Sequence, residues 1–195
     1  MGNLSGVDTT LNEMYLSQAL HNRTIHFVEE FERESCYKAI YLMERIERLD
    51  DEENLPVEKR VINIVWASYG GSAYGCLALI SVIERLKEKG YTINSHVQSM
   101  AMSAGFFTSI VCTHRTIARH AYLMCHQLSS GAFGTLQSME NEIEHSKDLN
   151  DRMLKITEKY TNITMKELLD MKNSNKDWFM NAEEALSLGC VDEII

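Results

Sequence analysis

The stretch Gln98-Ser99-Met100-Ala101-Met102-Ser103-Ala104-Gly105-Phe106-Phe107 joins a strand-like segment at 91–97 to an apolar helical run. Ser103 lies at the junction, and small residues follow it at once. A helix N-terminus carries unpaired backbone N–H groups and a positive dipole end, which stabilise negative charge that develops during acyl transfer. Serine is also a common helix cap, so this stretch alone predicts a strand–turn–helix unit with Ser103 as a possible nucleophile.

The segment before it repeats the pattern. The apolar run 61–66 is of strand length, the turn at 67–72 contains Gly70 and Gly71, and a helical stripe then continues to Gly90. Strands that alternate with helices predict an α/β fold with parallel strand pairs.

The rest of the chain predicts further elements of both kinds. We expect strands at 24–28, 115–118, 121–125 and 191–195, helices at 35–49 and 135–160, and two short helices that begin with capping boxes at Thr164 and Asn181. The acidic run 50–56 is expected to be a surface loop. Residues 1–20 are expected to form an N-terminal arm, and 21–195 one domain.

Composition and charge exclude several classes of function. The 195 residues are 45% hydrophobic and carry a net charge of −9, with the basic residues scattered along the chain. This pattern argues against nucleic acid and anionic membranes as partners. We find neither a signal peptide nor an apolar run long enough for a membrane span, so we expect a soluble, cytoplasmic protein.

Metal and cofactor sites are poorly supported. The five cysteines have no C-x-x-C spacing, the histidines form no H-E-x-x-H motif, and Gly70-Gly71 does not match a G-x-G-x-x-G phosphate loop. We therefore expect no metal and no cofactor, and reduced cysteines in the core.

Hydrolysis of an amide or ester needs a nucleophile, a base and fixed donors for the oxyanion. Ser103 and His126 each follow a predicted strand, so both can lie at one edge of a sheet. The N–H groups of the glycine turn at 70–71 and of Ala104 are suitable oxyanion donors.

Four motifs, in order along the chain, resemble those of the Clp endopeptidase proteolytic subunit family. They are the strand and glycine turn at 61–72, Met102 to Phe107, Met124-Cys125-His126-Gln127, and the closing pattern from Phe179 to Asp192. The resemblance implies a crotonase-like fold of repeated strand-strand-helix units. It also implies a serine endopeptidase that cleaves unfolded polypeptides or peptides inside two stacked heptameric rings of the same subunit.

The resemblance also implies roles for individual residues. Ser103 matches the nucleophile and His126 the general base, while Gly70 and Ala104 match the oxyanion donors. The resemblance places substrate binding at Gly71, Gln127, Leu128 and Ser129, next to a loop that pairs with an extended substrate. The helix at 135–160, longer than one domain needs, corresponds to the helix that projects to join the two rings.

The sequence departs from the family pattern at the third member of the triad. Counting back from Phe179 puts Asn173 at the aspartate position, and Asp170 nearby is the alternative. An Asn can hold a histidine ring but does not balance the imidazolium charge. Tyr69 replaces a proline, and Asn63 and Val65 replace aromatic residues that help to bind an unfoldase ATPase, so docking to such a partner is doubtful.

Alternative functions remain open at this point. Asn173 favours a catalytically weak or inactive ring subunit of a Clp-type assembly. A crotonase-type acyl-CoA enzyme on the same fold is disfavoured, because it does not need the Ser103 and His126 pair and usually carries catalytic Glu residues. A signal-peptide-processing peptidase would use a lysine base and a membrane context, and neither is evident.

Overall fold

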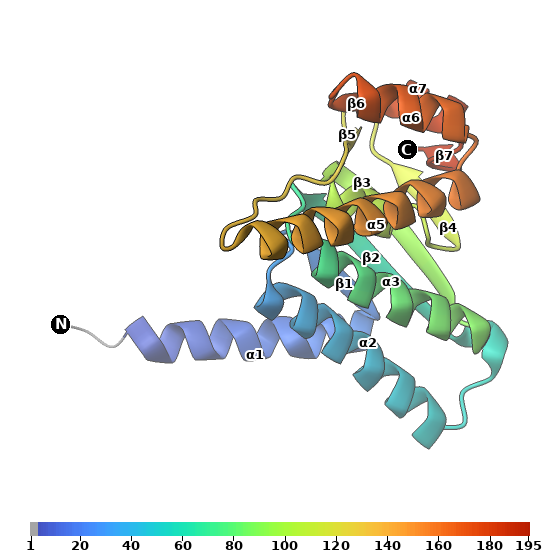
Figure 1. Cartoon of the computed structure of the whole chain (residues 1–195). Coiled ribbons are helices and arrows are strands. Elements are labelled where there is room, and N and C mark those ends of the chain that lie inside the picture. Colours follow the sequence, from blue (N-terminus) through green and yellow to red (C-terminus); the bar gives the residue numbers. More distant parts are fainter. Residues whose placement is uncertain (1–3) are drawn as a thin grey trace.

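The computed structural model describes the backbone of residues 4–195 and the side chains of residues 13–195. Helices and strands alternate along most of the chain (Figure 1). The elements are α1 (Leu4–Asn22), β1 (Thr24–Phe27), α2 (Arg33–Glu52), the 3-10 helix η1 (Val57–Lys59), β2 (Val61–Ser68), α3 (Ala73–Glu88), β3 (Thr92–Met102), α4 (Ala104–Ser109), β4 (His114–Ile117), β5 (Tyr122–Cys125), α5 (Leu136–Tyr160), α6 (Met165–Asn173), β6 (Trp178–Met180), α7 (Ala182–Ser187) and β7 (Glu193–Ile194).

One predominantly parallel sheet organises the molecule. Strands β1, β2, β3, β4 and β7 are hydrogen-bonded in that order, and every one of these pairs is parallel. The C-terminal end of β3, at 100–102, pairs with β5 in parallel orientation. Strand β5 pairs with β6 in antiparallel orientation. The expected α/β fold is thereby confirmed, with β6 as an additional strand that the sequence pattern did not predict.

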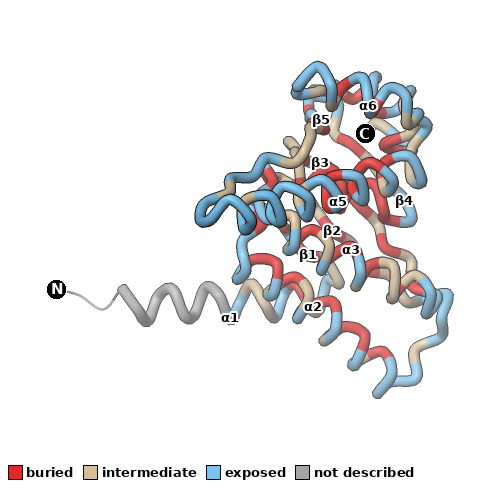
Figure 2. The backbone as a smooth tube through the Cα atoms, in the orientation of Figure 1, coloured by how far each residue is buried: buried red, intermediate tan, exposed pale blue. Residues whose placement is uncertain are grey.

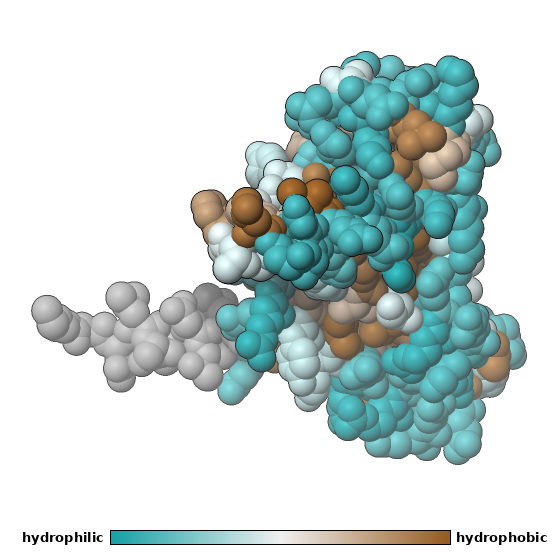
Figure 3. Space-filling view, viewed as in Figure 1, coloured by the Kyte–Doolittle hydropathy of each residue, from teal (hydrophilic) through white to brown (hydrophobic). Residues whose placement is uncertain are grey.

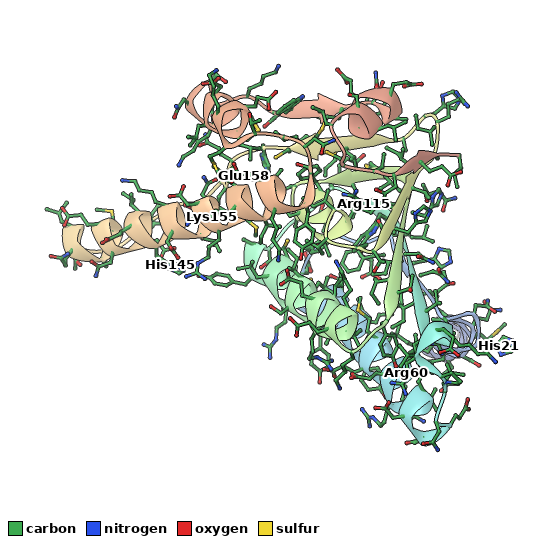
Figure 4. All side chains as sticks on the ribbon, turned by 90° about the vertical axis from the view of Figure 1, so that its right-hand side faces the viewer. His21, Arg60, Arg115, His145, Lys155 and Glu158 are labelled. Atoms are coloured by element: carbon green, nitrogen blue, oxygen red, sulfur yellow. The ribbon has the colours of Figure 1, made fainter. Side chains whose placement is uncertain are left out.

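The core forms between this sheet and the helices packed on it. Burial alternates along β2, where Ile62, Ile64 and Trp66 are fully buried. Helices α2 and α3 lie side by side and share one side of the sheet with α5 (Figures 1 and 4). Because these strands are parallel, their C-terminal ends lie at one common edge of the sheet. Helix α3 begins beside this edge, just after the end of β2.

The acidic run at 50–56 differs from the expected surface loop. Helix α2 continues to Glu52, and Asp50 is buried rather than exposed. Its carboxylate accepts two hydrogen bonds of 2.6 Å from the guanidinium of Arg23 and one of 2.8 Å from the hydroxyl of Tyr91. Because these donors replace water, the charge can be buried.

Helix α1 covers most of the expected N-terminal arm. Ala19 is buried, and Tyr15, Leu16 and Leu20 pack against the core. The expected boundary between residues 20 and 21 therefore falls inside a helix, whose last turns belong to the domain. Residues 1–3 of the expected arm lie outside the described residues.

Helix α5 projects from the domain, as the sequence predicts. Its 25 residues are largely exposed in the first half, and burial begins at Leu149 (Figure 2). Phe133 just before the helix, Leu136 at its start and Ile143 two turns further are exposed, and apolar surface gathers at the free end (Figure 3). In the part of the chain that the structure describes, no helix combines the length and apolarity of a membrane span.

Candidate active site

Ser103 lies in a strained turn between β3 and α4. Its backbone has φ 52° and ψ −118°, a region that residues other than glycine rarely adopt and that costs about 1–3 kcal/mol. Its N–H donates to the carbonyl of Met124 at 2.9 Å, which ties the turn to β5. The side chain makes no capping bond to helix α4. The hydroxyl is therefore not engaged as a helix cap and is available for another partner.

That partner is His126, the residue after β5. Its Nε2 lies 2.8 Å from the hydroxyl oxygen of Ser103, within hydrogen-bond distance. The parallel pairing of β3 with β5, in which Met102 lies opposite Met124, brings the ends of both strands together. The structure thus brings the predicted pair into contact across 23 positions of sequence.

Asp177 completes the row of three side chains. Its Oδ1 lies 3.4 Å from Nδ1 of His126, on the opposite side of the ring from Ser103. Strands β5 and β6 fix this position, because Cys125 pairs with Trp178 in antiparallel register and the next pair outward is His126 with Asp177. The Asp177 side chain is 59% exposed. Sequence reasoning missed this residue, although it directly precedes the short strand opposite the histidine.

The structure does not bring the expected third members, Asn173 and Asp170, to His126. Both lie on the exposed side of α6, and Asp170 forms an ion pair of 2.9 Å with Lys166. Helix α6 ends at Asn173, and a turn with Asn175 at φ 52° separates it from β6. Among the described side chains, it is Asp177 and neither of these two that reaches His126.

The glycine turn packs directly against the Ser103 turn. A Cβ at Gly70 would lie 2.6 Å from the carbonyl oxygen of Met102 and 3.0 Å from the backbone nitrogen of Ala104. With φ 103° as well, only glycine fits there. The N–H of Gly70 donates to the hydroxyl of Ser68 at 3.2 Å, so this predicted oxyanion donor already has an acceptor.

A cleft of about 280 Å³, open to solvent, lies over Ser103 and His126. The predicted residues Ala104, Gly71, Gln127, Leu128 and Ser129 all line it, whereas Gly70 does not. Its apolar wall consists of Ala73, Phe107, Met124 and Met153, with the ring of Tyr69 also lining it. The arrangement can hold an extended chain with an apolar side chain beside the serine.

Two amide side chains hold the segment that follows His126. The N–H of Leu128 donates to Oδ1 of Asn150 at 2.8 Å, and the side chain of Gln127 donates to that of Asn175. Asn150 lies on α5, and Asn175 lies in the turn that leads to Asp177. Sequence analysis predicted neither contact.

Cys76, which contacts the residue after Ser103, has an unreactive thiol. Cys76 is completely buried behind α4, 3.4 Å from the carbonyl oxygen of Ala104, and burial raises the pKa of its thiol to about 12. It remains protonated and is a poor nucleophile. Among the described residues, no group of three or more His, Cys, Asp and Glu side chains lies close enough to hold a metal ion.

The comparisons with known proteins agree with this fold. The model of the Clp protease family matches residues 8–195. An "ATP-dependent Clp protease proteolytic subunit" of Deinococcus radiodurans is 30% identical over 65% of this chain and 60% of that protein. An "ATP-dependent Clp protease proteolytic subunit 2" of Synechococcus sp. is 25% identical over 92% of this chain and 86% of that protein. On the match across nearly its whole length, this chain belongs to the Clp protease family.

Proposed function

We propose that the chain is a catalytically active subunit of a serine endopeptidase, with Ser103 as nucleophile, His126 as general base and Asp177 as the group that orients His126. The observation that carries this proposal is the 2.8 Å contact between Ser103 Oγ and His126 Nε2, continued by Asp177 at Nδ1. An activated serine needs its base within hydrogen-bond distance and a third group behind the base, and these positions meet both conditions.

The proposed reaction proceeds through an acyl-enzyme. Ser103 Oγ attacks the peptide carbonyl carbon while its proton moves to His126 Nε2. His126 then donates that proton to the leaving nitrogen, the C–N bond breaks, and water hydrolyses the serine ester with the same base. The carboxylate of Asp177, 3.4 Å from Nδ1 of His126, stabilises the imidazolium that forms.

The negative charge on the carbonyl oxygen needs donors close to Ser103. We assign the backbone N–H of Ala104 as one donor, because it is the first residue of α4 and lines the cleft. For Gly70 to act as the second, its N–H must exchange its long bond to Ser68 for the oxyanion. Gly71, Gln127, Leu128 and Ser129 are proposed to line the substrate-binding cleft, and the apolar wall favours an apolar side chain next to the cleaved bond.

For the assembly, we propose two stacked rings of identical subunits joined through α5. The exposed apolar side chains at the start of this helix support that proposal, since a helix end of this kind is stabilised when a partner covers it. The substrates are then unfolded polypeptides or peptides that enter the enclosed chamber. Asn63 and Val65 do not favour docking of an unfoldase ATPase, and such a partner is not part of the proposal.

Labelling with a fluorophosphonate tests the catalytic role of Ser103. We expect the assembled wild-type protein to be labelled covalently and to cleave a fluorogenic peptide, and Ser103→Ala to do neither. The same size distribution by light scattering for both proteins is the control for assembly. Equal labelling of the two proteins, or none in the assembled wild type, would refute the proposal.

The second candidate is a ring subunit with weak catalysis. The exposed carboxylate of Asp177, at a distance longer than an ordinary N–H···O hydrogen bond, is the observation in its favour. Assembled protein that is labelled slowly and turns over peptides hardly at all would support this candidate.

A further inference from the structure

Asn150 is a buried polar side chain with an unusual set of contacts. It lies on α5 and is only 6% exposed. Its Oδ1 accepts the 2.8 Å hydrogen bond from the N–H of Leu128, while its Nδ2 is buried without a hydrogen-bond partner among the described residues. An amide in this state is half satisfied.

Such a side chain costs stability. A buried donor without a partner lowers the stability of the fold, and an apolar side chain at this position would avoid that cost. Packing therefore gives no reason for an asparagine at this position. What the asparagine supplies is a carbonyl oxygen within reach of the Leu128 N–H, which would otherwise be left without an acceptor at the wall of the cleft.

The bond to Asn150 determines which way the backbone of 127–129 faces. Residues 126–130 form neither helix nor turn, and in an extended chain the N–H groups of successive residues point to opposite sides. Because the N–H of Leu128 points toward α5, an extended course of this segment would turn the backbone groups of Gln127 and Ser129 the other way. These are the groups that remain available to pair with an extended peptide.

The position of Asn150 also links this segment to the helix. Leu149 is the first residue of α5 in the buried half, and Met153, one turn after Asn150, lines the cleft. Lys155 and Glu158 continue the same helix toward the body of the domain, whereas His145 lies on its exposed half (Figure 4). A shift of α5 along its axis would therefore move the acceptor of the Leu128 N–H.

We infer that Asn150 is a positioning residue for substrate binding: its Oδ1 holds the Leu128 N–H so that the backbone of Gln127 and Ser129 is presented to the peptide. This role rests on the proposed peptidase function. It predicts weaker binding of extended peptides when the acceptor is removed, with little change in the reactivity of Ser103 itself.

The test uses two substitutions in the assembled protein, one that removes the acceptor and one that keeps it. Asn150→Leu removes the acceptor, and Asn150→Asp keeps an oxygen in its place. We expect Asn150→Leu to raise KM about 10-fold or more for a peptide of six or more residues and to change kcat and the fluorophosphonate labelling rate less than about 3-fold. We expect Asn150→Asp to restore KM at least in part.

A second measurement does not depend on activity. Hydrogen exchange of a peptide that covers 124–130 should become faster in Asn150→Leu and stay close to wild type in Asn150→Asp, with unfolding temperature and assembly as checks. Unchanged exchange in Asn150→Leu would overturn the positioning role, even if Ser103 proves catalytic. Equal losses of kcat and labelling rate in Asn150→Leu would also overturn the positioning role. If the wild-type protein has no peptidase activity but the two variants differ in exchange as expected, only the peptidase function is contradicted.

A double-mutant cycle separates the bond from general packing. Proline at 128 removes the backbone N–H, so in the Leu128→Pro background the further change Asn150→Leu should cost much less in KM than it does in the wild-type background. Equal costs in the two backgrounds would show that Asn150 acts through packing and not through the Leu128 N–H.

Discussion

At the scale of single residues, the assignment that changed most is the group behind His126. Counting along the sequence led to Asn173, but the antiparallel register of β5 and β6 places Asp177 opposite His126. A carboxylate there can balance the imidazolium charge, which an amide cannot do. The main sequence argument for a weak catalyst, an asparagine in the triad, therefore loses its basis.

Asp177 and Asn173 can be compared directly. We expect Asp177→Asn to lower kcat about 10²- to 10⁴-fold, the upper figure being the loss that the same change causes in a chymotrypsin-type triad. Asn173→Asp, on the exposed end of α6, should leave kcat within about 2-fold of wild type. Steady-state kinetics with one fluorogenic peptide measures both. A gain in Asn173→Asp together with an unaffected Asp177→Asn would restore the assignment made from sequence.

At the scale of elements, the sequence was most informative where hydrophobic periodicity is long. The strand predicted at 61–66 is a continuous apolar run of strand length, and the helix predicted at 135–160 repeats its apolar residues over many turns; the structure has them at 61–68 and 136–160. Strand β6 has three residues, of which Phe179 is exposed, so no period identifies it. Unless β6 is recognised, its register with β5 is unknown, and the sequence alone does not show that Asp177 lies opposite His126.

The contact between Asn150 and Leu128 could not be predicted from the sequence either. It joins a side chain on one element to a backbone N–H on another, and the sequence holds no pattern for such a pair. The Ser103 and His126 pair was predictable for the opposite reason, since each residue directly follows a parallel strand and those strand ends share one edge.

The free end of α5 gives a prediction at this scale. Leu136 is 77% exposed, and a charge there should disfavour a contact that buries it. We expect Leu136→Asp to shift the assembled protein to about half its mass by light scattering, and Gln137→Asp, at the neighbouring exposed polar position, to leave the mass unchanged. A full-mass assembly in Leu136→Asp would exclude this helix end from the contact between rings.

At the scale of the whole molecule, one buried ion pair connects distant parts of the chain. Asp50, at the end of α2, is bound by Arg23 between α1 and β1 and by Tyr91 just before β3. Burial acts to raise the pKa of Asp50, but the hydrogen bonds from Arg23 and Tyr91 outweigh it and hold the pKa below its usual value. The group thus stabilises the fold when it is charged.

This network gives a pH-dependent stability. A lowered pKa in the folded state contributes stability that is present above the unfolded-state pKa, about 3.9, and is lost as the pH falls through the folded-state value. We expect Asp50→Asn to reduce the free energy of unfolding by about 2–3 kcal/mol at pH 7, because Arg23 loses its charged partner.

Urea unfolding of both proteins between pH 7 and pH 3 measures the effect. The difference between wild type and Asp50→Asn should begin to shrink as the pH falls below about 4, where the carboxyl of the unfolded wild type takes up a proton, and should disappear only below the lower pKa of the folded state. A difference that stays constant over this range would show that Asp50 stabilises the fold by packing rather than by its charge.

The antiparallel ladder between β5 and β6 has a consequence for changes in chain length. After His126 the chain runs outward along 127–135, returns to the domain along α5 and reaches the site again through α6, and the ladder fixes both ends of this excursion at His126 and Asp177. Whole turns could be inserted into the exposed half of α5 without displacing either side chain, provided that the outgoing segment 130–135 is lengthened by the same distance. A single inserted residue within 178–180 would instead shift the register and carry the carboxylate away from the ring. The reach of the subunit toward a neighbour can therefore be lengthened or shortened independently of its chemistry.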